Sequence, residues 1–339
     1  MRFFKKNSRC FIVAEVSANH AQDIKKAISM IRQAKRCGAD AVKFQAYTPD
    51  TLTIDSNNRY FKIRHTKWKG QTLYKLYAKA ATPWSWFKEL KKVADSEGII
   101  FFASAFDKKS VDLLEELDVP IHKITSFEII DQPLIEYVAK TRKPLILSTG
   151  MATLREIKEA LSAAKATKEV ALLKCVSSYP ASAEDMHLRT IEDMHSRFKV
   201  PIGISDHSLG TAVSVAAVAL GAKIVEKHFT LSSRSKTPDS FFSITPDELK
   251  RLVADIRITE DALGKVSYGK NPNENINRIF RRSLFAVKDI LKGELITESN
   301  VRSIRPSHGL KPEHYKKALG GRAKKKIKKG TPLSWNLME

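Results

Sequence analysis

The sequence predicts an α/β protein made of a (β/α)8 barrel of the TIM type followed by a small C-terminal domain. Strand-like apolar runs alternate with amphipathic helical patterns over about the first 260 residues, a polar stretch ends the alternation, and short β-like runs follow it. The chain has 339 residues, of which 42% are hydrophobic and 28% are charged. This composition is typical of a globular protein that buries its core without the help of disulfides.

Eight apolar runs rich in β-branched and aromatic residues are the predicted strands. In chain order they are FIVAEV (11–16), DAVKFQAY (40–47), IIFFASAF (99–106), IHKITS (121–126), PLILSTG (144–150), VALLKCVSSYP (170–180), PIGISDH (201–207) and KIVEKHFTL (223–231). A doubly wound open sheet is the competing architecture, and it typically has a glycine-rich loop after its first strand. The corresponding segment here, AEVSANHA, has no glycine, so we expect the barrel.

Helical patterns separate these runs. IKKAISMIRQAKRCG places apolar residues on one face and ends in a glycine. Similar patterns cover residues 84–97, 108–117, 153–165, 208–220 and, beginning with a capping box, 245–264. The segment 48–82 is too long for an ordinary loop between strand and helix, and its aromatic residues predict that it is ordered.

The chain divides in three by composition. We expect a catalytic barrel over residues 1–264 and a linker over 265–278, where Pro272 and several asparagines occur. Residues 279–339 then form a small β-rich domain with one or two short helices, in which the Lys-Gly and Gly-Gly pairs indicate turns.

Composition also limits the functional class. The three cysteines form no CxxC pair, and Glu15 interrupts the only apolar run near the N-terminus, which argues against a secretory signal. No apolar stretch is long enough to cross a bilayer, so we expect a cytoplasmic protein that binds no membrane. The formal net charge of +22 is interpreted as a general lysine bias, because the lysines occur throughout and few are interleaved with aromatics.

Polar residues gather at the ends of the predicted strands, which is where the active sites of such barrels lie. The ends supply two lysines, several serines and two histidines on the seventh and eighth strands. Ammonium and hydroxyl groups suit a phosphate, and histidines on adjacent strands can share a divalent metal. A single histidine or lysine in such a place is more often structural, and it is the combination on successive strands that predicts a site.

Seven segments in order resemble the sialic acid synthase family. They are AEVSANH (14–20), KFQAYTPD (43–50), STGMAT (148–153), SSYP (177–180), GISDHSLG (203–210), EKHFTL (226–231) and RSIRPSHGL (302–310). Members of this family condense phosphoenolpyruvate with an acylamino sugar. The resemblance implies a barrel followed by an antifreeze-protein-like (SAF) domain in a domain-swapped homodimer.

Within this family the chain resembles most the pseudaminic acid synthase branch. TLYKLYAKAATPWSW (72–86) is similar to an aromatic-rich segment of that branch, and KITSFEI (123–129) is similar to its version of the fourth strand. The implied sugar is 2,4-diacetamido-2,4,6-trideoxy-L-altrose, a diacetamido-trideoxyhexose. Synthesis of N-acetylneuraminate or legionaminate from another acylamino sugar is the alternative.

The resemblance also implies roles for individual residues. His207 and His228 would hold the metal, with Mn²⁺ expected and Mg²⁺ or Co²⁺ as alternatives. Catalytic roles fall to Glu15, Lys43 and Lys123, and Glu15 would act as a proton acceptor or hold the metal-bound water. The residues expected to bind the substrates are Gln45, Ser104, Ser126, Ser148, Ser177, Tyr179, Ser205, Asp239 and Arg305, the last reaching into the partner's site.

The sequence departs from the family pattern at several positions. Ala21-Gln22 follows His20 where the family has Asn-Gly, and Thr237 precedes Pro-Asp where the family has glycine. The serine of SAFD (104–107) lacks its usual following proline, Ser177 replaces the asparagine of sialic acid synthases, and Ser307 replaces a glycine. None of these changes removes an expected metal or phosphate group, so we expect an active enzyme.

Two other classes remain as alternatives. Eight basic residues between Lys316 and Lys329 could bind nucleic acid, but no recognition motif accompanies them, and a solvated face is the better interpretation. A Schiff-base aldolase or another phosphate-binding barrel would share the fold, because a fold does not determine its chemistry.

Overall fold

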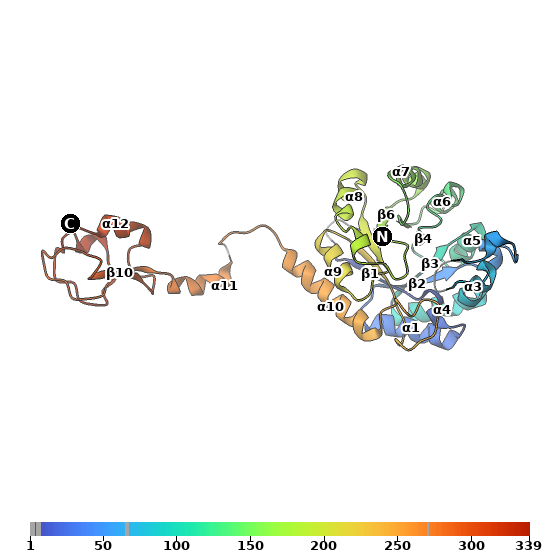
Figure 1. The fold of residues 1–339 in the computed structure, drawn as a ribbon, viewed down its shortest axis with the longest axis horizontal. Coiled ribbons are helices and arrows are strands. Elements are labelled where there is room, and N and C mark those ends of the chain that lie inside the picture. Colours follow the sequence, from blue (N-terminus) through green and yellow to red (C-terminus); the bar gives the residue numbers. More distant parts are fainter. Residues whose placement is uncertain (1–3, 5–7, 65–67, 270) are drawn as a thin grey trace. The chain divides into compact units, whose positions relative to one another are not determined.

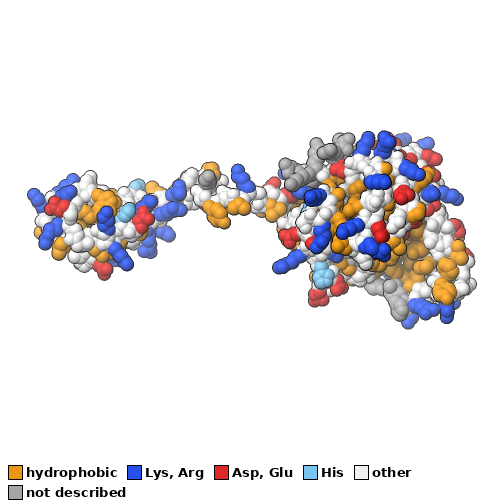
Figure 2. Space-filling view, turned by 90° about the horizontal axis from the view of Figure 1, so that it is seen from above, with side chains coloured by type: hydrophobic (Ala, Val, Ile, Leu, Met, Phe, Trp, Pro, Cys, Tyr) orange, Lys and Arg blue, Asp and Glu red, His pale blue; other side chains and the backbone are white. Residues whose placement is uncertain are grey.

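The computed structural model describes residues 4, 8–64, 68–269 and 271–339, and it divides the chain into two compact units, Met1–Gly264 and Lys265–Glu339. The predicted insertion (48–82) and linker (265–278) therefore each contain residues outside the described ranges, namely 65–67 and 270. Figure 1 shows a strand-and-helix barrel in the first unit and a smaller second unit with little regular structure. Lys and Arg side chains are visible on both units (Figure 2).

Eight parallel strands close into a barrel in the order β1 to β8, which confirms the predicted fold class. They are β1 (Phe11–Glu15), β2 (Ala41–Ala46), β3 (Ile100–Ala105), β4 (His122–Ile124), β5 (Leu145–Ser148), β6 (Val170–Cys175), β7 (Ile202–Asp206) and β8 (Ile224–His228). Several are shorter than predicted at the carboxyl end. VALLKCVSSYP, for example, continues beyond the end of β6 as a loop that contains Ser177, Ser178, Tyr179 and Pro180.

Helices cover the outside of the barrel (Figure 1). They are α1 (Ile24–Arg36), α4 (Phe87–Glu97), α5 (Lys108–Glu116), α6 (Gln132–Ala139), α7 (Leu154–Ala163), α8 (Thr190–Phe198), α9 (Ala212–Ala219) and α10 (Pro246–Leu263). The sequence patterns did not predict α6 and α8, which have 8 and 9 residues. Their buried residues join the core that fills the space between strands and helices.

The insertion between β2 and α4 is ordered in its described part. It forms α2 (Pro49–Leu52), the 3-10 turn η2 (Arg59–Phe61), α3 (Leu73–Ala80) and the 3-10 turn η3 (Trp84–Trp86). The Tyr77 ring of α3 lies 5.8 Å from the Tyr47 ring, with the edge of one ring against the face of the other. The aromatic residues of the segment thus fasten it to the rim of the barrel.

The second unit has its own small core and sheet. Strands β9 (Ser283–Ala286) and β10 (Val301–Ile304) pair antiparallel, and α11 (Pro272–Asn275), the 3-10 turn η6 (Ile276–Phe280) and α12 (Tyr315–Ala318) accompany them. Gly293, Gly320 and Gly330 have positive φ, which places them in the turns that the Lys-Gly and Gly-Gly pairs predicted. Leu284, Val301 and Leu333 are fully buried in its core.

No helix among the described residues is long and apolar enough to span a membrane.

Candidate active site

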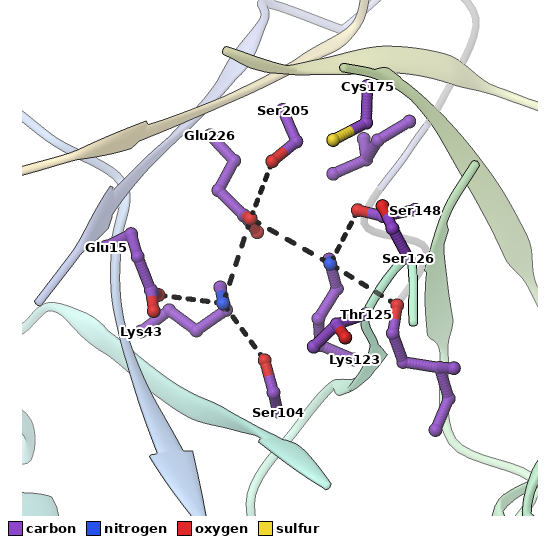
Figure 3. Close-up of polar contacts among 12 residues, drawn as sticks. Glu15, Lys43, Ser104, Lys123, Thr125, Ser126, Ser148, Cys175, Ser205 and Glu226 are labelled. Atoms are coloured by element: carbon purple, nitrogen blue, oxygen red, sulfur yellow. Dashed lines mark hydrogen bonds and ion pairs between the residues drawn. The ribbon is translucent and has the colours of Figure 1, made fainter. Parts of the chain in front are cut away.

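The register of the barrel aligns the predicted polar residues at its carboxyl end. Glu15 of β1 pairs with Lys43 of β2 on one side and His228 of β8 on the other. In the same way Ser104 of β3 lies opposite Lys123 of β4. Alternate residues of a strand point to the same side, so these side chains face the inside of the barrel. Figure 3 shows four of them, Glu15, Lys43, Ser104 and Lys123.

Lys43 is at the centre of one half of this cluster. Its Nζ lies 2.7 Å from Oε2 of Glu15 and donates to the Ser104 hydroxyl at 3.0 Å. The amide of Gln45 donates to the other oxygen of Glu15 at 2.9 Å. The side chains of Lys43 and Glu15 are almost completely buried, and each ion therefore depends on the other for compensation.

Lys123 forms the other half. Its Nζ donates to the Ser148 hydroxyl at 2.7 Å, and it lies 3.8 Å from Oε1 of Glu226. The same carboxylate oxygen lies 3.7 Å from Nζ of Lys43 and accepts a hydrogen bond from Ser205 at 3.1 Å. Glu226 therefore links the two lysines, as the dashed lines of Figure 3 show.

The surroundings shift the pKa values of these groups in different directions. Burial raises the pKa of Glu15 above its ordinary value, although the Lys43 charge opposes the shift. Burial also acts to raise the pKa of Glu226, but the charges of Lys123 and Lys43 outweigh it and lower the value. Burial lowers the pKa of Lys123. The cluster thus contains one carboxyl group that gains a proton more readily than usual and one that stays ionised.

Hydroxyl groups surround Gly150, next to Lys123. The Gly150 amide donates to the Ser126 hydroxyl at 3.0 Å. A Cβ at Gly150 would lie 2.2 Å from Oγ of Ser177 and 2.7 Å from Oγ of Ser126, so only glycine fits there. With Ser148 this arrangement forms a ring of donors of the kind that binds an anion.

The two predicted metal ligands lie side by side. The rings of His207 and His228 have centroids 5.3 Å apart. The Tyr179 ring lies 4.5 Å from that of His207, and the Phe242 ring lies 4.7 Å from that of His228. Aromatic side chains therefore flank the histidine pair and hold its two rings in place.

These histidines fit a metal-binding role. Nδ1 of His207 lies 2.8 Å from the carbonyl of Val176, which orients the ring and leaves Nε2 for another partner. Nδ1 of His228 is buried without a hydrogen-bond partner. Burial lowers the pKa of His228 well below its ordinary value, so the ring is neutral, which is the form that binds a metal. The described residues contain no group of three or more potential metal ligands.

Lys227, next to His228 on β8, lies in a different environment from Lys43 and Lys123. Lys227 points out of the barrel, where its Nζ lies 2.8 Å from Oδ2 of Asp206, and both side chains are fully buried. Asp206 in turn accepts from the hydroxyl of Ser214 on α9. Of three consecutive ionisable residues, Glu226 and His228 therefore face the site, and Lys227 joins the barrel to its helices.

The remaining predicted residues lie at different distances from this cluster. Asp239 is on the loop after β8, where its carboxylate accepts from the Ala18 amide at 3.3 Å, and burial raises its pKa. Gln45 connects Glu15 with Ser17, whose hydroxyl accepts from the amide of Gln45 at 2.8 Å. Arg305 is exposed and belongs to the second unit.

Sequence reasoning did not assign a role to three residues of this site: Glu226, Gly150 and Phe242. Glu226 could have been found, since it is two residues before His228 and a strand repeats its facing every second residue. No pattern indicated that a glycine would be required between two serines, or that Phe242 of a distant loop would pack on a histidine.

Comparison with known proteins identifies the family. A NeuB family model matches residues 30–268, and a SAF domain model matches residues 281–339. The chain belongs to the NeuB family. The NeuB match includes Lys43, Lys123 and both histidines but begins after Glu15, and the SAF match includes Arg305.

The chain is similar to several NeuB relatives over nearly its whole length. The pseudaminic acid synthase of Campylobacter jejuni is 43% identical over 97% of this chain and 97% of its own length. That of Helicobacter pylori is 44% identical, with coverages of 95% and 96%. The N,N'-diacetyllegionaminic acid synthase of Legionella pneumophila is 35% identical, with coverages of 97% and 95%.

A solved structure is similar as well. The N-acetylneuraminic acid (sialic acid) synthetase of Leptospira borgpetersenii, in complex with citrate, matches with a TM-score of 0.72 and 34% identity. The match covers 80% of this chain and 90% of that one.

Proposed function

We propose that this protein is a pseudaminic acid synthase, which condenses phosphoenolpyruvate with 2,4-diacetamido-2,4,6-trideoxy-L-altrose and water to give pseudaminate and phosphate. The observation that carries the proposal is the identity of 43% and 44% to two pseudaminic acid synthases, against 35% to a legionaminic acid synthase of similar coverage. The geometry of the barrel mouth supports the chemistry.

Lys43 and Lys123 bind the anionic groups of phosphoenolpyruvate in this proposal. Their ammonium groups come from neighbouring parts of the mouth and already share Glu226. Hydroxyl groups of Ser104, Ser148 and Ser205 lie within hydrogen-bond distance of members of this cluster. Two cations with several neutral donors suit a ligand that has one carboxylate and one phosphate.

In this proposal the sugar binds next to the cluster of lysines and serines, beside His207, His228 and Tyr179. A divalent ion bound by the two histidines, Mn²⁺ in our proposal, would polarise the sugar aldehyde as a Lewis acid. C3 of phosphoenolpyruvate then forms a bond to C1 of the sugar, water adds at C2, and phosphate leaves with cleavage of its C–O bond. Burial raises the pKa of Glu15, which suits it to accept the proton of that water.

We also propose that the protein forms a domain-swapped homodimer and that it is located in the cytoplasm. Ile276, Ile279 and Phe280 of η6 are exposed apolar residues in the second unit, of the kind that a partner surface covers. Arg305 would then complete the site of the other subunit. All three cysteines are free, as a reducing compartment requires.

Phosphate release with two sugars tests the proposal. The protein is incubated with phosphoenolpyruvate, Mn²⁺ and either 2,4-diacetamido-2,4,6-trideoxy-L-altrose or N-acetylmannosamine. We expect release with the first sugar only, and none after treatment with a chelator. Release with N-acetylmannosamine alone would replace the proposed sugar, and release that survives complete metal removal would rule out the role of the histidines.

A further inference from the structure

Neither the sequence nor the proposed function assigns a role to Glu226, which lies at the centre of the barrel cluster (Figure 3). Its Oε1 lies 3.7 Å from Nζ of Lys43 and 3.8 Å from Nζ of Lys123, and it accepts a hydrogen bond from Ser205 at 3.1 Å. Its other oxygen, Oε2, is buried and has no hydrogen-bond partner among the described residues. A buried carboxylate oxygen without a donor is costly for the fold, so the charge of Glu226 needs an explanation other than packing.

The two ammonium groups contact Glu226 without using a hydrogen-bond donor. Separations of 3.7 Å and 3.8 Å exceed the length of a hydrogen bond, so these contacts are ionic. Each ammonium group lies at hydrogen-bond distance from two other oxygens, those of Glu15 and Ser104 for Lys43, and those of Ser148 and the Ile124 carbonyl for Lys123. An ammonium group has three N–H donors. Each lysine therefore retains a donor for a bound anion.

The two lysines depend on Glu226 to different degrees. Lys43 has a second carboxylate, that of Glu15, at 2.7 Å. For Lys123, Glu226 is the one carboxylate that forms an ion pair with it in the described part of the chain. A buried ammonium group that has no carboxylate beside it gives up its proton readily. Loss of the Glu226 charge should therefore affect Lys123 more than Lys43.

The charges around Lys123 agree with this dependence. Burial is the largest influence on the pKa of Lys123 and lowers it, and among the neighbouring charges Glu226 has the largest effect and raises it. The other titratable groups that interact with Lys123 are Cys175 of β6 and Glu15 of β1, which raise its pKa, Lys43 of β2, which lowers it, and Glu128 and His228. Glu226 is thus the main group that opposes the effect of burial on Lys123.

We propose that Glu226 is a positioning residue that holds Lys43 and Lys123 as a pair of ammonium groups at a fixed spacing for the two anionic groups of phosphoenolpyruvate. The inference rests on the proposed function and adds to it the counter-ion that its anion site requires. Glu226 acts through the two lysines, which it keeps charged before the substrate arrives. Ser205 fixes the carboxylate from a third side by its hydrogen bond to the same oxygen.

Glu226→Gln tests this role, because it removes the charge and keeps the shape of the side chain. The dependence of kcat/KM for phosphoenolpyruvate on pH is measured from neutral to alkaline pH. Without the carboxylate the pKa of Lys123 falls further, so we expect the alkaline limb of the profile to move to lower pH by about one unit or more. At neutral pH kcat/KM should fall about tenfold or more, and the loss should become smaller as the pH is lowered. A purely structural role would not move the limb.

Glu226→Asp keeps the charge but draws it back by one methylene group. Its alkaline limb should lie between those of the wild type and Glu226→Gln, and most of the activity at neutral pH should remain. The control is Asp206→Asn, which removes a buried carboxylate paired with Lys227 on the outer side of the barrel. It should leave the limb in place. Circular dichroism shows which variants are folded.

An unmoved limb in folded Glu226→Gln, or an equal movement in Asp206→Asn, would overturn this inference alone. If Glu226→Gln does not fold, Glu226→Asp decides, and a limb at the wild-type position would overturn the inference. A wild type that releases no phosphate with any sugar tested would overturn the proposed function and this inference with it.

Discussion

Lys123 is the residue whose proposed contact with the anionic substrate can be tested most directly. Its side chain is buried, and its ammonium group contacts Ser148 and Glu226 on the inside of the barrel. Lys123→Met keeps most of the side-chain volume but removes the charge. We expect a fall in kcat/KM for phosphoenolpyruvate of about 100-fold or more, because a preorganised cation is lost from a site of low dielectric.

Steady-state kinetics with varied phosphoenolpyruvate measures this effect. Lys174→Met is the matched control, since Lys174 precedes Cys175 on β6 and has the opposite facing. Equal losses in both variants would contradict the assignment of Lys123 to the anion site.

A second prediction at the scale of the residue concerns Gly150, where the structure has no room for a side chain. A methyl group there would come within 2.2 Å of the Ser177 hydroxyl and 2.7 Å of the Ser126 hydroxyl. Gly150→Ala should therefore displace both serines and raise KM for phosphoenolpyruvate about tenfold or more. Circular dichroism of the same variant checks that the fold is intact. A folded variant with unchanged KM would show that these hydroxyls do not bind the substrate.

At the scale of the element, the two sides of β8 are expected to have different roles, one in stability and the other in the proposed chemistry. Lys227 points outward to Asp206, whereas its neighbours Glu226 and His228 point inward. Removal of one partner of a buried ion pair leaves an uncompensated charge. Lys227→Met should therefore lower the free energy of unfolding by about 3 kcal/mol or more, with little change in KM for either substrate.

Urea denaturation and kinetics on the same preparation measure both effects. Addition of Asp206→Asn to Lys227→Met should recover part of the lost stability, because the unpaired carboxylate is then removed. A variant with native stability and no activity would place Lys227 in the site instead.

Much of the barrel could be predicted from the sequence because its strands are apolar runs that end in polar residues. The carboxyl ends of parallel strands meet at one face, so Lys43, Lys123 and His207 could be placed together without coordinates. The central position of Glu226 could not, since it depends on distances across the barrel. The helices α6 and α8 were missed, and their length alone does not explain this, since α5 and α9 have the same lengths and were predicted.

At the scale of the whole molecule, the dimer can be tested by mixing two inactive proteins. Arg305→Ala retains the barrel cluster, and His228→Ala retains Arg305. If the second unit serves the partner's barrel, a mixed dimer has one intact site. Random subunit exchange should then restore about a quarter of the wild-type activity.

The mixture is assayed for phosphate release after subunits have exchanged, with each variant alone as the control. Restored activity requires that the arginine acts between subunits. If Arg305 served its own barrel, neither chain of the mixed dimer would have a complete site, and the mixture would stay inactive.

The barrel mouth contains two carboxyl groups and two ammonium groups, Glu15, Glu226, Lys43 and Lys123, so its formal charges cancel. The excess of +22 resides elsewhere on the chain. We therefore expect the charges of the outer surface to attract the proposed anionic substrate over long range, and the residues of the barrel mouth to recognise it at short range. Added potassium chloride should slow encounter and lower kcat/KM for phosphoenolpyruvate, while turnover at saturation stays nearly constant.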